Sequence, residues 1–162
     1  MKVIFLDIDG VLNNDRTPAT IERYTFVDDE KVALLKQLVE ETGAQLVLSS
    51  TWRRGWYCLD HVPEPNVSDQ QDIRLFQALR AKLEAYGLTL LDYTEDFGPR
   101  GKEVAKWLAT WAGEPISSFV ILDDMEPSEL HPYEKQQIRT YFWNGLLPAH
   151  VEKAIRLLKE EK

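Results

Sequence analysis

The sequence predicts an α/β fold in which helices cover both faces of a mostly parallel, five-stranded sheet. Short apolar runs with the character of buried strands alternate along the chain with longer segments whose apolar residues recur at helical spacing. This alternation is typical of parallel sheets, because the crossover between two parallel strands is usually a helix that packs against the sheet. The length of 162 residues fits one domain on a scale of about 150 residues per domain, and we expect a single domain over residues 1–162.

The apolar runs predict the strands, over residues 3–8, 45–48, 88–91, 119–122 and 139–143. Helical spacing predicts the helices, over residues 29–42, 72–86, 101–111 and 149–159. Asp28 or Asp29 is the expected N-cap of the first helix, and Asp72 is that of the second. Gly43 and Gly87 are expected to end these two helices. Two segments without a sustained period are expected to be irregular loops, over residues 13–27 and 52–71.

Composition and charge exclude several classes of protein. Lys and Arg number 19 against 27 Asp and Glu, and the resulting net charge of −8 is a poor match for non-specific binding to duplex DNA. A single cysteine, Cys58, excludes a disulfide framework and a zinc site built from cysteines. No apolar run approaches the roughly 18 residues of a membrane span. We therefore expect a cytoplasmic protein with no membrane contact and no obligate protein partner.

Polar side chains follow three of the predicted strands at the point where each strand ends. These are Asp7-Ile8-Asp9, Ser49-Ser50 and Asp123-Asp124. In open parallel sheets, ligands bind outside the carboxyl ends of the strands. Strand alternation would also place the side chains of Asp7 and Asp9 on one face of the sheet. The sequence therefore predicts a functional site at this edge.

The stretch Asp7-Ile8-Asp9-Gly10-Val11-Leu12 resembles the first motif of the haloacid dehalogenase (HAD) superfamily of phosphohydrolases. Matches to the other three motifs follow in the order of the superfamily: Ser49 after the second strand, Lys102 at the start of a helix, and Asp123-Asp124 after the fourth strand. The resemblance covers residues 3 to about 125 and implies a Rossmann-like, three-layer α/β/α sandwich. The stretches LDIDGVLN, VLSSTWR and ILDD are most similar to capless members, namely the HAD domain of Swiss Army knife RNA-repair proteins and the phosphatase half of polynucleotide kinase-phosphatases.

The spacing of the motifs agrees with the absence of a cap domain. In the superfamily, caps are inserted either after the first motif or before the lysine of the third. Here about 15 residues separate Leu12 from the helix at Asp28, and about ten separate Leu91 from Lys102. A domain typically needs about 50 residues or more, so neither gap holds one.

The resemblance implies a phosphomonoester hydrolase that depends on Mg²⁺ and forms an aspartyl-phosphate intermediate. Asp7 would be the nucleophile. Asp9 would protonate the leaving oxygen and then deprotonate a water molecule. Lys102 would supply a fixed positive charge opposite the nucleophile.

A cation is also expected on physical grounds, because two like charges 4 Å apart repel by about 4 kcal/mol at an effective dielectric near 20. Oxygen ligands around a phosphate suit Mg²⁺. By the pattern of the superfamily, the metal takes the carboxylate of Asp7, the backbone carbonyl of Asp9 and a carboxylate of the fourth motif. Asp124 is the first choice for that carboxylate and Asp123 the alternative, with the other in support.

Ser49 is expected to hydrogen-bond a phosphoryl oxygen, and Ser50 is its rival for that position. Arg53 is a further candidate for binding the phosphate. Arg54 is expected to be solvated, although together with Arg53 and Arg100 it would make a local basic rim. The expected partner is a phosphorylated substrate, either a small molecule such as a nucleotide or the end of a nucleic acid.

Three other classes compete with a phosphohydrolase. A phosphoacceptor domain resembling response-regulator receivers would carry a lone phosphorylated aspartate after a later strand, where this chain has Ser49. A Toprim-type nucleic-acid domain needs a glutamate after its first strand and a DxD motif later, which is the reverse order. A non-catalytic binding module would keep the fold, and turnover is what separates it from an enzyme.

Overall fold

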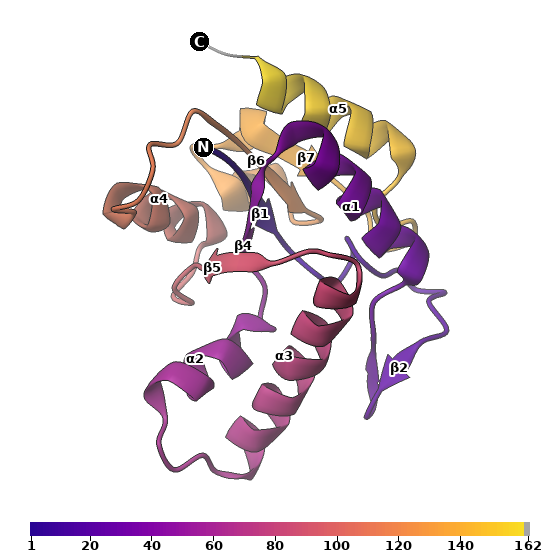
Figure 1. Ribbon diagram of the computed structural model, residues 1–162, viewed down its shortest axis with the longest axis vertical. Helices are drawn as coiled ribbons and strands as arrows, with labels where there is room; N and C mark the ends of the chain where they lie inside the picture. Colours follow the sequence, from indigo (N-terminus) through magenta and orange to yellow (C-terminus); the bar gives the residue numbers. More distant parts are fainter. Residues whose placement is uncertain (161–162) are drawn as a thin grey trace.

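The computed structural model describes residues 1–160, and its centre is one sheet with strand order β5-β4-β1-β6-β7. All four pairings in this sheet are parallel, as the sequence predicts. The strands are β1 (Lys2–Leu6), β4 (Gln45–Leu48), β5 (Leu90–Tyr93), β6 (Ser118–Asp123) and β7 (Gln137–Arg139). The predicted five-stranded sheet is therefore confirmed (Figure 1).

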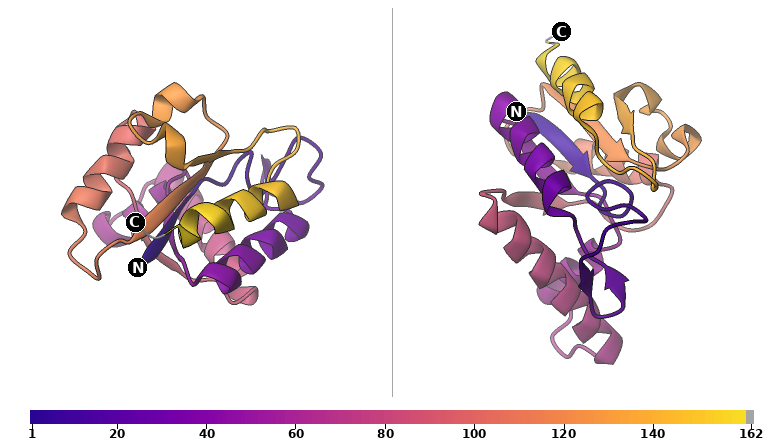
Figure 2. Two further views of the ribbon diagram at one scale, coloured as in Figure 1. Left: turned by 90° about the horizontal axis from the view of Figure 1, so that it is seen from above. Right: turned by 90° about the vertical axis from the view of Figure 1, so that its right-hand side faces the viewer.

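Helices cover both faces of the sheet and make it the middle of three layers (Figure 2). Ile4 and Leu6 of β1 belong to a core that also holds apolar residues of α1 (Asp29–Thr42), α3 (Val67–Ala85) and α5 (Pro148–Lys159). Val3 and Phe5 of the same strand pack on the other side. That side is covered by α4 (Arg100–Thr110) and the short 3-10 helix η1 (Pro127–Leu130), and a second 3-10 helix, η2 (Glu134–Gln136), precedes β7. Within residues 1–160, no helix combines the length and the apolar character needed to cross a membrane.

The segment after β4 differs from the prediction, because it forms a helical hairpin instead of a long loop. Helix α2 (Arg53–His61) is followed by α3, which begins at Val67 and not at residue 72. Asn66 caps α3 in a reciprocal capping box with Asp69, so the expected cap Asp72 lies inside the helix. The two helices pack closely at Gly55, where a Cβ atom would overlap the backbone of α3.

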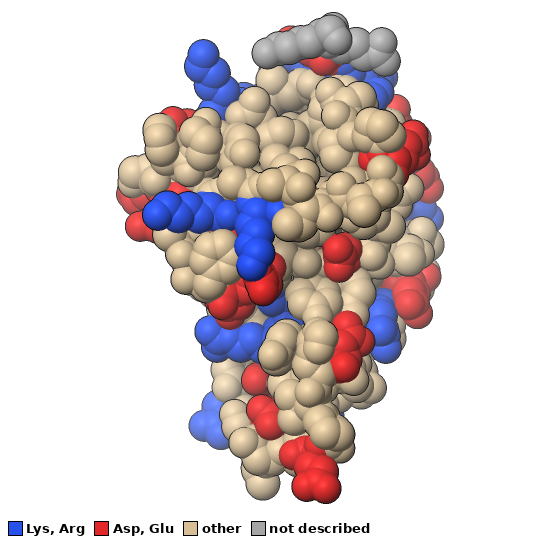
Figure 3. Space-filling view, turned by 90° about the vertical axis from the view of Figure 1, so that its left-hand side faces the viewer, with Lys and Arg blue, Asp and Glu red and all other residues tan. Residues whose placement is uncertain are grey.

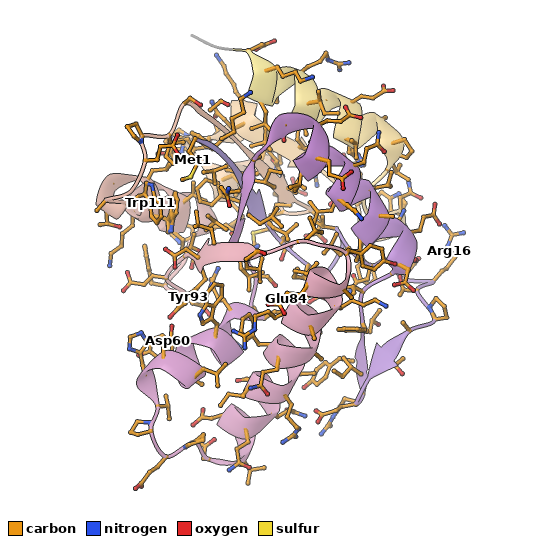
Figure 4. All side chains as sticks on the ribbon, viewed as in Figure 1. Met1, Arg16, Asp60, Glu84, Tyr93 and Trp111 are labelled. Atoms are coloured by element: carbon orange, nitrogen blue, oxygen red, sulfur yellow. The ribbon has the colours of Figure 1, made fainter. Side chains whose placement is uncertain are left out.

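The helical hairpin is attached to the sheet edge through aromatic contacts. The ring of Trp56 on α2 lies 5.2 Å from that of Phe76 on α3 and 4.8 Å from that of Tyr93 on β5. The hydroxyl of Tyr93 donates a hydrogen bond of 3.4 Å to Asp60, and Figure 4 shows these two side chains close together. Burial, followed by the nearby charge of Asp60, raises the pKa of Tyr93 to about 12. Trp56 therefore helps to close the core between the helical hairpin and β5.

The segment over residues 13–27 is mostly irregular, as predicted, but it contains a small hairpin of β2 (Thr20–Ile21) and β3 (Tyr24–Thr25). Glu22 at its turn accepts hydrogen bonds from Arg74 (2.9 Å) and Gln71 (3.0 Å), both on α3. The hairpin is thus fastened to α3, beside which it lies in Figure 2. No cap domain is inserted at this position or between β5 and α4.

The last strand ends earlier than predicted, at Arg139 and not at residue 143. The aromatic run after it has strand propensity, but it forms a turn in which the N–H of Asn144 donates to the carbonyl of Tyr141 at 2.9 Å. Thr140 is buried and donates from its hydroxyl to the carbonyl of Gly10 at 2.6 Å. The loop after β7 therefore packs against the turn that follows β1.

The turn after β1 brings Gly10 against the end of β6. The carbonyl of Ile8 accepts hydrogen bonds from the N–H groups of Val11 (3.0 Å) and Leu12 (2.8 Å), which makes one tight helical turn. Gly10 has a φ angle of +81°, and a Cβ atom at this position would overlap the carboxylate of Asp124. Only glycine meets both conditions without strain.

We predict that Gly10→Ala destabilises the protein by about 2–5 kcal/mol, from the positive φ angle and the steric overlap together. Gly43→Ala is the matched control, because Gly43 has a φ angle of +70° with no atom within 4 Å of the added Cβ. Gly43→Ala should cost only the conformational part, about 1–2 kcal/mol. Urea denaturation measures both free energies of unfolding. Equal losses in the two variants would show that the approach of Asp124 is not tight.

Candidate active site

Three residues at the carboxyl ends of neighbouring strands form a row along the edge of the sheet. Leu6 of β1 is paired with Leu48 of β4 and with Leu122 of β6, so the next residues are Asp7, Ser49 and Asp123. The N–H of Asp7 donates to the carbonyl of Leu122 (3.0 Å), and that of Ser49 donates to Leu6 (2.8 Å), which continues the ladder by one rank. The sequence prediction that these strand ends meet is confirmed.

The row faces α4. Phe5, Val47 and Ile121 lie two residues before Asp7, Ser49 and Asp123, respectively. They pack in the core that contains Val104 and Trp107 of α4. Side chains two apart on a strand share a face, so the row points toward the start of this helix. Its members are buried, with Ser49 and Asp123 fully so.

Asp124 joins this row and completes a cluster of carboxylates. Asp7, Asp123 and Asp124 each offer one carboxylate oxygen, and the three oxygens lie within 4.8 Å of one another. Burial raises the pKa of Asp7 well above its usual range, and the charges of Asp123 and Asp124 raise it further. Burial and Asp123 also raise the pKa of Asp124. The cluster therefore favours the binding of a proton or a cation.

The donors in this cluster fit Mg²⁺. They are all oxygens, they come from three carboxylates, and Asp124 is only partly buried. Mg²⁺ prefers oxygen ligands and usually retains several water molecules, so a cluster open on one side suits it. The structure brings Asp123 and Asp124 equally into the cluster, and Asp123 is the one that is also engaged in an ion pair.

The positive charge opposite Asp7 comes from Arg100, the first residue of α4. Its Nη1 atom lies 2.7 Å from Oδ2 of Asp123 and 3.5 Å from Oδ1 of Asp7, and the side chain is only 8% exposed. Burial lowers the pKa of Arg100, but Asp123 and Asp7 outweigh this effect and raise it. The sequence predicts Arg100 only as part of a basic rim.

Lys102 does not lie in the cluster, which corrects the prediction from the third motif. It is exposed, and it forms no ion pair within the part of the chain that the structure describes. Two residues along a helix correspond to a rotation of about 200°. Since Arg100 faces the carboxylates, Lys102 points away from them.

The expectation that strand alternation places Asp7 and Asp9 on one face does not apply, because Asp9 lies beyond the end of β1 and outside the carboxylate cluster. Strand β1 ends at Leu6, and the tight turn that follows directs Asp9 toward the start of α2. Its carboxylate accepts hydrogen bonds from the indole N–H of Trp52 (3.1 Å) and the amide of Asn13 (2.9 Å). Asn13 in turn accepts from the N–H of Gly10 at 2.9 Å. Two donors therefore fix the carboxylate of Asp9.

The two serines after β4 have different surroundings. The hydroxyl of Ser50 accepts a hydrogen bond of 3.3 Å from the N–H of Trp52. The hydroxyl of Ser49 is buried and has no hydrogen-bond partner among residues 1–160. A buried polar group without a partner is costly, and an anionic ligand beside Asp7 would supply one. The geometry favours Ser49 over Ser50.

Arg53 is held in a buried ion pair and does not form part of an exposed rim, which corrects a second expectation. Its guanidinium contacts Glu103 of α4 at 3.1 Å, Thr94 at 3.0 Å and Asp96 at 3.1 Å, and the side chain is 2% exposed. Glu103 lies 3.8 Å from Nε of Arg100. Arg53 therefore acts on the site indirectly, by holding the glutamate beside Arg100.

The surface near this network carries charges of both signs. Arg54 forms an ion pair with Asp96 at 3.1 Å. Figure 3, which shows the side of the molecule with α4, has basic and acidic side chains interspersed and no continuous basic surface. The face in view is therefore not built for strong non-specific attraction of a nucleic-acid backbone.

A cavity of about 490 Å³ lies beside Asp9 and Trp52. Its other walls come from the β2–β3 hairpin, the helical hairpin and the loop after β7: Arg23, Tyr24, Thr25, Thr51, Arg54, Asp72, Leu75 and Phe142. The cavity thus lies next to the turn that carries Asp9. Asn13, Glu103 and Thr140 support the site and were not identified from the sequence. Only the fold brings Thr140 near the motifs, whereas Asn13 and Glu103 lie beside motif residues in the chain and are recognised by their contacts.

Comparison with known proteins agrees with this geometry. A family model described as the HAD domain in Swiss Army Knife RNA repair proteins matches residues 3–151. The match extends past the motifs to include β7 and the start of α5. A search of curated proteins finds no match. The family model covers most of the chain, and the chain therefore belongs to the HAD domain family of Swiss Army Knife RNA repair proteins.

Proposed function

We propose that this protein is a Mg²⁺-dependent phosphomonoester hydrolase that acts through an aspartyl-phosphate intermediate. The observation that carries the proposal is the cluster of Asp7, Asp123 and Asp124 with Arg100 opposite, in a chain of the HAD family. Asp7, Asp124 and the backbone carbonyl of Asp9 would hold Mg²⁺, which when bound neutralises charge on the phosphoryl group and on the carboxylates.

Asp7 attacks phosphorus with one carboxylate oxygen in the proposed reaction. The bond from phosphorus to the ester oxygen breaks, and the leaving alcohol takes a proton from Asp9. Asp9 then accepts a proton from a water molecule, whose oxygen attacks phosphorus. The bond between phosphorus and Asp7 breaks, which releases inorganic phosphate and restores both carboxyl groups.

Ser49 and Arg100 are proposed to bind the phosphoryl oxygens. The free hydroxyl of Ser49 lies in the same row as Asp7, and Arg100 approaches Asp7 from α4. Such fixed donors stabilise charge that develops on the transferred group. In this proposal Arg100 takes the role that the sequence motif assigned to Lys102.

The proposed substrate is a phosphorylated small molecule such as a nucleotide, or a nucleic-acid end. The name of the family supports the nucleic-acid end. The absence of an inserted cap domain supports a site open to large substrates. The cytoplasmic location also stays a prediction, which cell fractionation would test.

We predict that Asp7→Asn lowers Mg²⁺-dependent hydrolysis of an aryl phosphate by about a thousandfold or more, since it removes the nucleophile. Asp15→Asn is the control, because Asp15 is an exposed aspartate whose carboxylate pairs with Arg16, and its backbone hydrogen bond does not involve the side chain. It should keep full activity. A steady-state assay of released phosphate measures both.

Two outcomes would contradict this mechanism. Metal-dependent turnover that persists in Asp7→Asn would exclude Asp7 as the nucleophile. A long-lived phosphorylated aspartate without turnover in the wild type would favour a phosphoacceptor domain instead. A screen across nucleotides, sugar phosphates, phosphopeptides and phosphorylated oligonucleotides identifies the substrate.

Arg100 and Lys102 make a matched pair for a second prediction. Arg100→Lys keeps a positive charge but loses the planar group that reaches Asp123 and Asp7, and kcat should fall by about 10²- to 10³-fold. Lys102→Ala removes an exposed charge, and kcat should change by less than about twofold. A large loss of kcat in Lys102→Ala, with little change in Arg100→Lys, would show that Lys102 has the role predicted from the third motif.

The raised pKa values of Asp7 and Asp124 predict how Mg²⁺ changes stability with pH. Without metal, the folded state retains protons that the unfolded chain has lost, so the stability from these groups falls as pH rises above the ordinary aspartate value of about 3.9. Mg²⁺ binds the ionised cluster. The rise in melting temperature on adding Mg²⁺ should therefore be small near pH 5 and reach about 5–10 °C near pH 8 at a hundredfold excess over Kd.

Thermal denaturation at several pH values, with and without Mg²⁺, measures this difference. Groups whose pKa is lowered in the folded state, such as Asp96, change the stability equally with and without Mg²⁺. Their effect therefore cancels in the difference between the two melting temperatures. Asp124→Asn is expected to lose most of the shift. A shift independent of pH, or one that survives in Asp124→Asn, would place the metal elsewhere.

A further inference from the structure

The cavity beside Asp9 has no role in the chemistry described so far. Its volume of about 490 Å³ lies within the range of about 300–1,000 Å³ typical of small-molecule sites. Asp9 lines it, and Asp9 is the residue proposed to protonate the leaving oxygen. A general acid must lie within hydrogen-bond reach of the atom it protonates. An alcohol that takes its proton from Asp9 would therefore lie at this cavity.

Aromatic residues from three separate segments line the cavity. They are Tyr24 of the β2–β3 hairpin, Trp52 before α2, and Phe142 of the loop after β7, and Leu75 of α3 adds an aliphatic surface. Tyr24 and Phe142 are 42% and 46% exposed. Large rings exposed around a cavity, rather than singly on a surface, mark a ligand site.

Each aromatic segment is anchored by hydrogen bonds to another part of the chain. The N–H of Asp15 donates to the carbonyl of Phe142 at 3.1 Å, which ties this loop to the segment after the first motif. The indole of Trp52 is only 8% exposed and donates to Asp9 at 3.1 Å. Glu22 anchors the hairpin that carries Tyr24 to α3. Rings held in place lose little entropy on binding and favour a flat ligand surface.

The polar groups of the cavity do not favour one alcohol over another, so its aromatic rings carry the selectivity. Two of its hydroxyl-bearing residues, Thr25 and Thr51, are small, and the charged residues are of both signs. A sugar needs many directed hydrogen bonds, whereas a planar ring needs apolar contact on its faces. A second cavity, of about 590 Å³ and lined by Arg53 and Cys58, does not include Asp9 and is not placed to hold a leaving group.

We infer that the cavity receives the alcohol part of the phosphomonoester and selects alcohols that carry a planar ring, such as nucleosides. This inference rests on the proposed phosphatase function of Asp7 and Asp9. Phe142 is the specificity residue that is easiest to isolate, because it lines the cavity without contacting the carboxylate cluster. The adjacent Trp143 is 56% exposed and does not line the cavity.

The test compares nucleoside monophosphates with glycerol phosphate as substrates for the wild type, Phe142→Ala and Trp143→Ala. In Phe142→Ala, kcat/KM for the nucleotides should fall by about 5- to 140-fold, the size expected of one stacked ring. The loss should appear mainly in KM. Hydrolysis of glycerol phosphate by Phe142→Ala should stay within twofold of the wild type, and Trp143→Ala should match the wild type on both substrates.

Equal losses for both substrates in Phe142→Ala, or equal effects of Phe142→Ala and Trp143→Ala, would overturn the inference. A wild type without preference for nucleotides over glycerol phosphate would also overturn it. If no substrate is hydrolysed, including an aryl phosphate, the proposed function fails. Calorimetric titration of Asp7→Asn with a nucleoside monophosphate then tests whether the cavity binds a nucleoside. Binding that Phe142→Ala abolishes in this background supports the cavity, and absent binding refutes it.

Discussion

The charge balance between Arg100 and the buried carboxylates is the constraint on which the site depends. Asp7 and Asp123 lie at the ends of adjacent strands, so the pairing of β1 with β6 sets the distance between them. Each loses most of its contact with water, and each repels the other. Removing one partner from a buried ion pair typically costs about 3–5 kcal/mol, because an uncompensated charge is left behind. The positive charge of the Arg100 guanidinium offsets the repulsion between the two carboxylates when no metal is bound.

The position of Arg100 is itself maintained by a second layer of charge. Glu103, one turn along α4, lies near its Nε atom and also binds Arg53 and the backbone N–H groups of Phe97 and Gly98. The loop that leads into α4, the start of α2 and α4 itself thus meet at one glutamate. The sequence predicts that Arg53 binds the phosphate. In the structure it instead holds Glu103, which lies beside Arg100. Direct contact with phosphate is left to Ser49 and Arg100 in the proposed mechanism.

The strands of the sheet and the edge that carries the candidate site could both be predicted from the sequence. Apolar runs that end in acids or serines identify buried strands and their carboxyl ends, and parallel pairing then places those ends together. Helix α2 was missed because its apolar side chains are mainly aromatic and its capping side chain is absent. The exchange of Lys102 for Arg100 was missed because a motif fixes order along the chain, whereas the exact start of a helix decides which residue faces the sheet. The turn of Asp9 toward Trp52 depends on where β1 ends, which periodicity cannot locate to one residue.

The strand order has a consequence for when the candidate site forms during folding. β1 lies between β4 and β6, so Asp7 sits between segments that follow it by about forty and more than a hundred residues. Such long-range contacts form late, because the entropy of closing the intervening chain must first be overcome. The hydrogen bond from Thr140 to Gly10 adds a contact of still greater sequence separation, between the loop after the last strand and the turn after the first. A nascent chain that has not yet produced β6 holds one carboxylate of the cluster and no Arg100 contact to Asp123, so the candidate site is complete only when nearly the whole domain has been synthesised and folded.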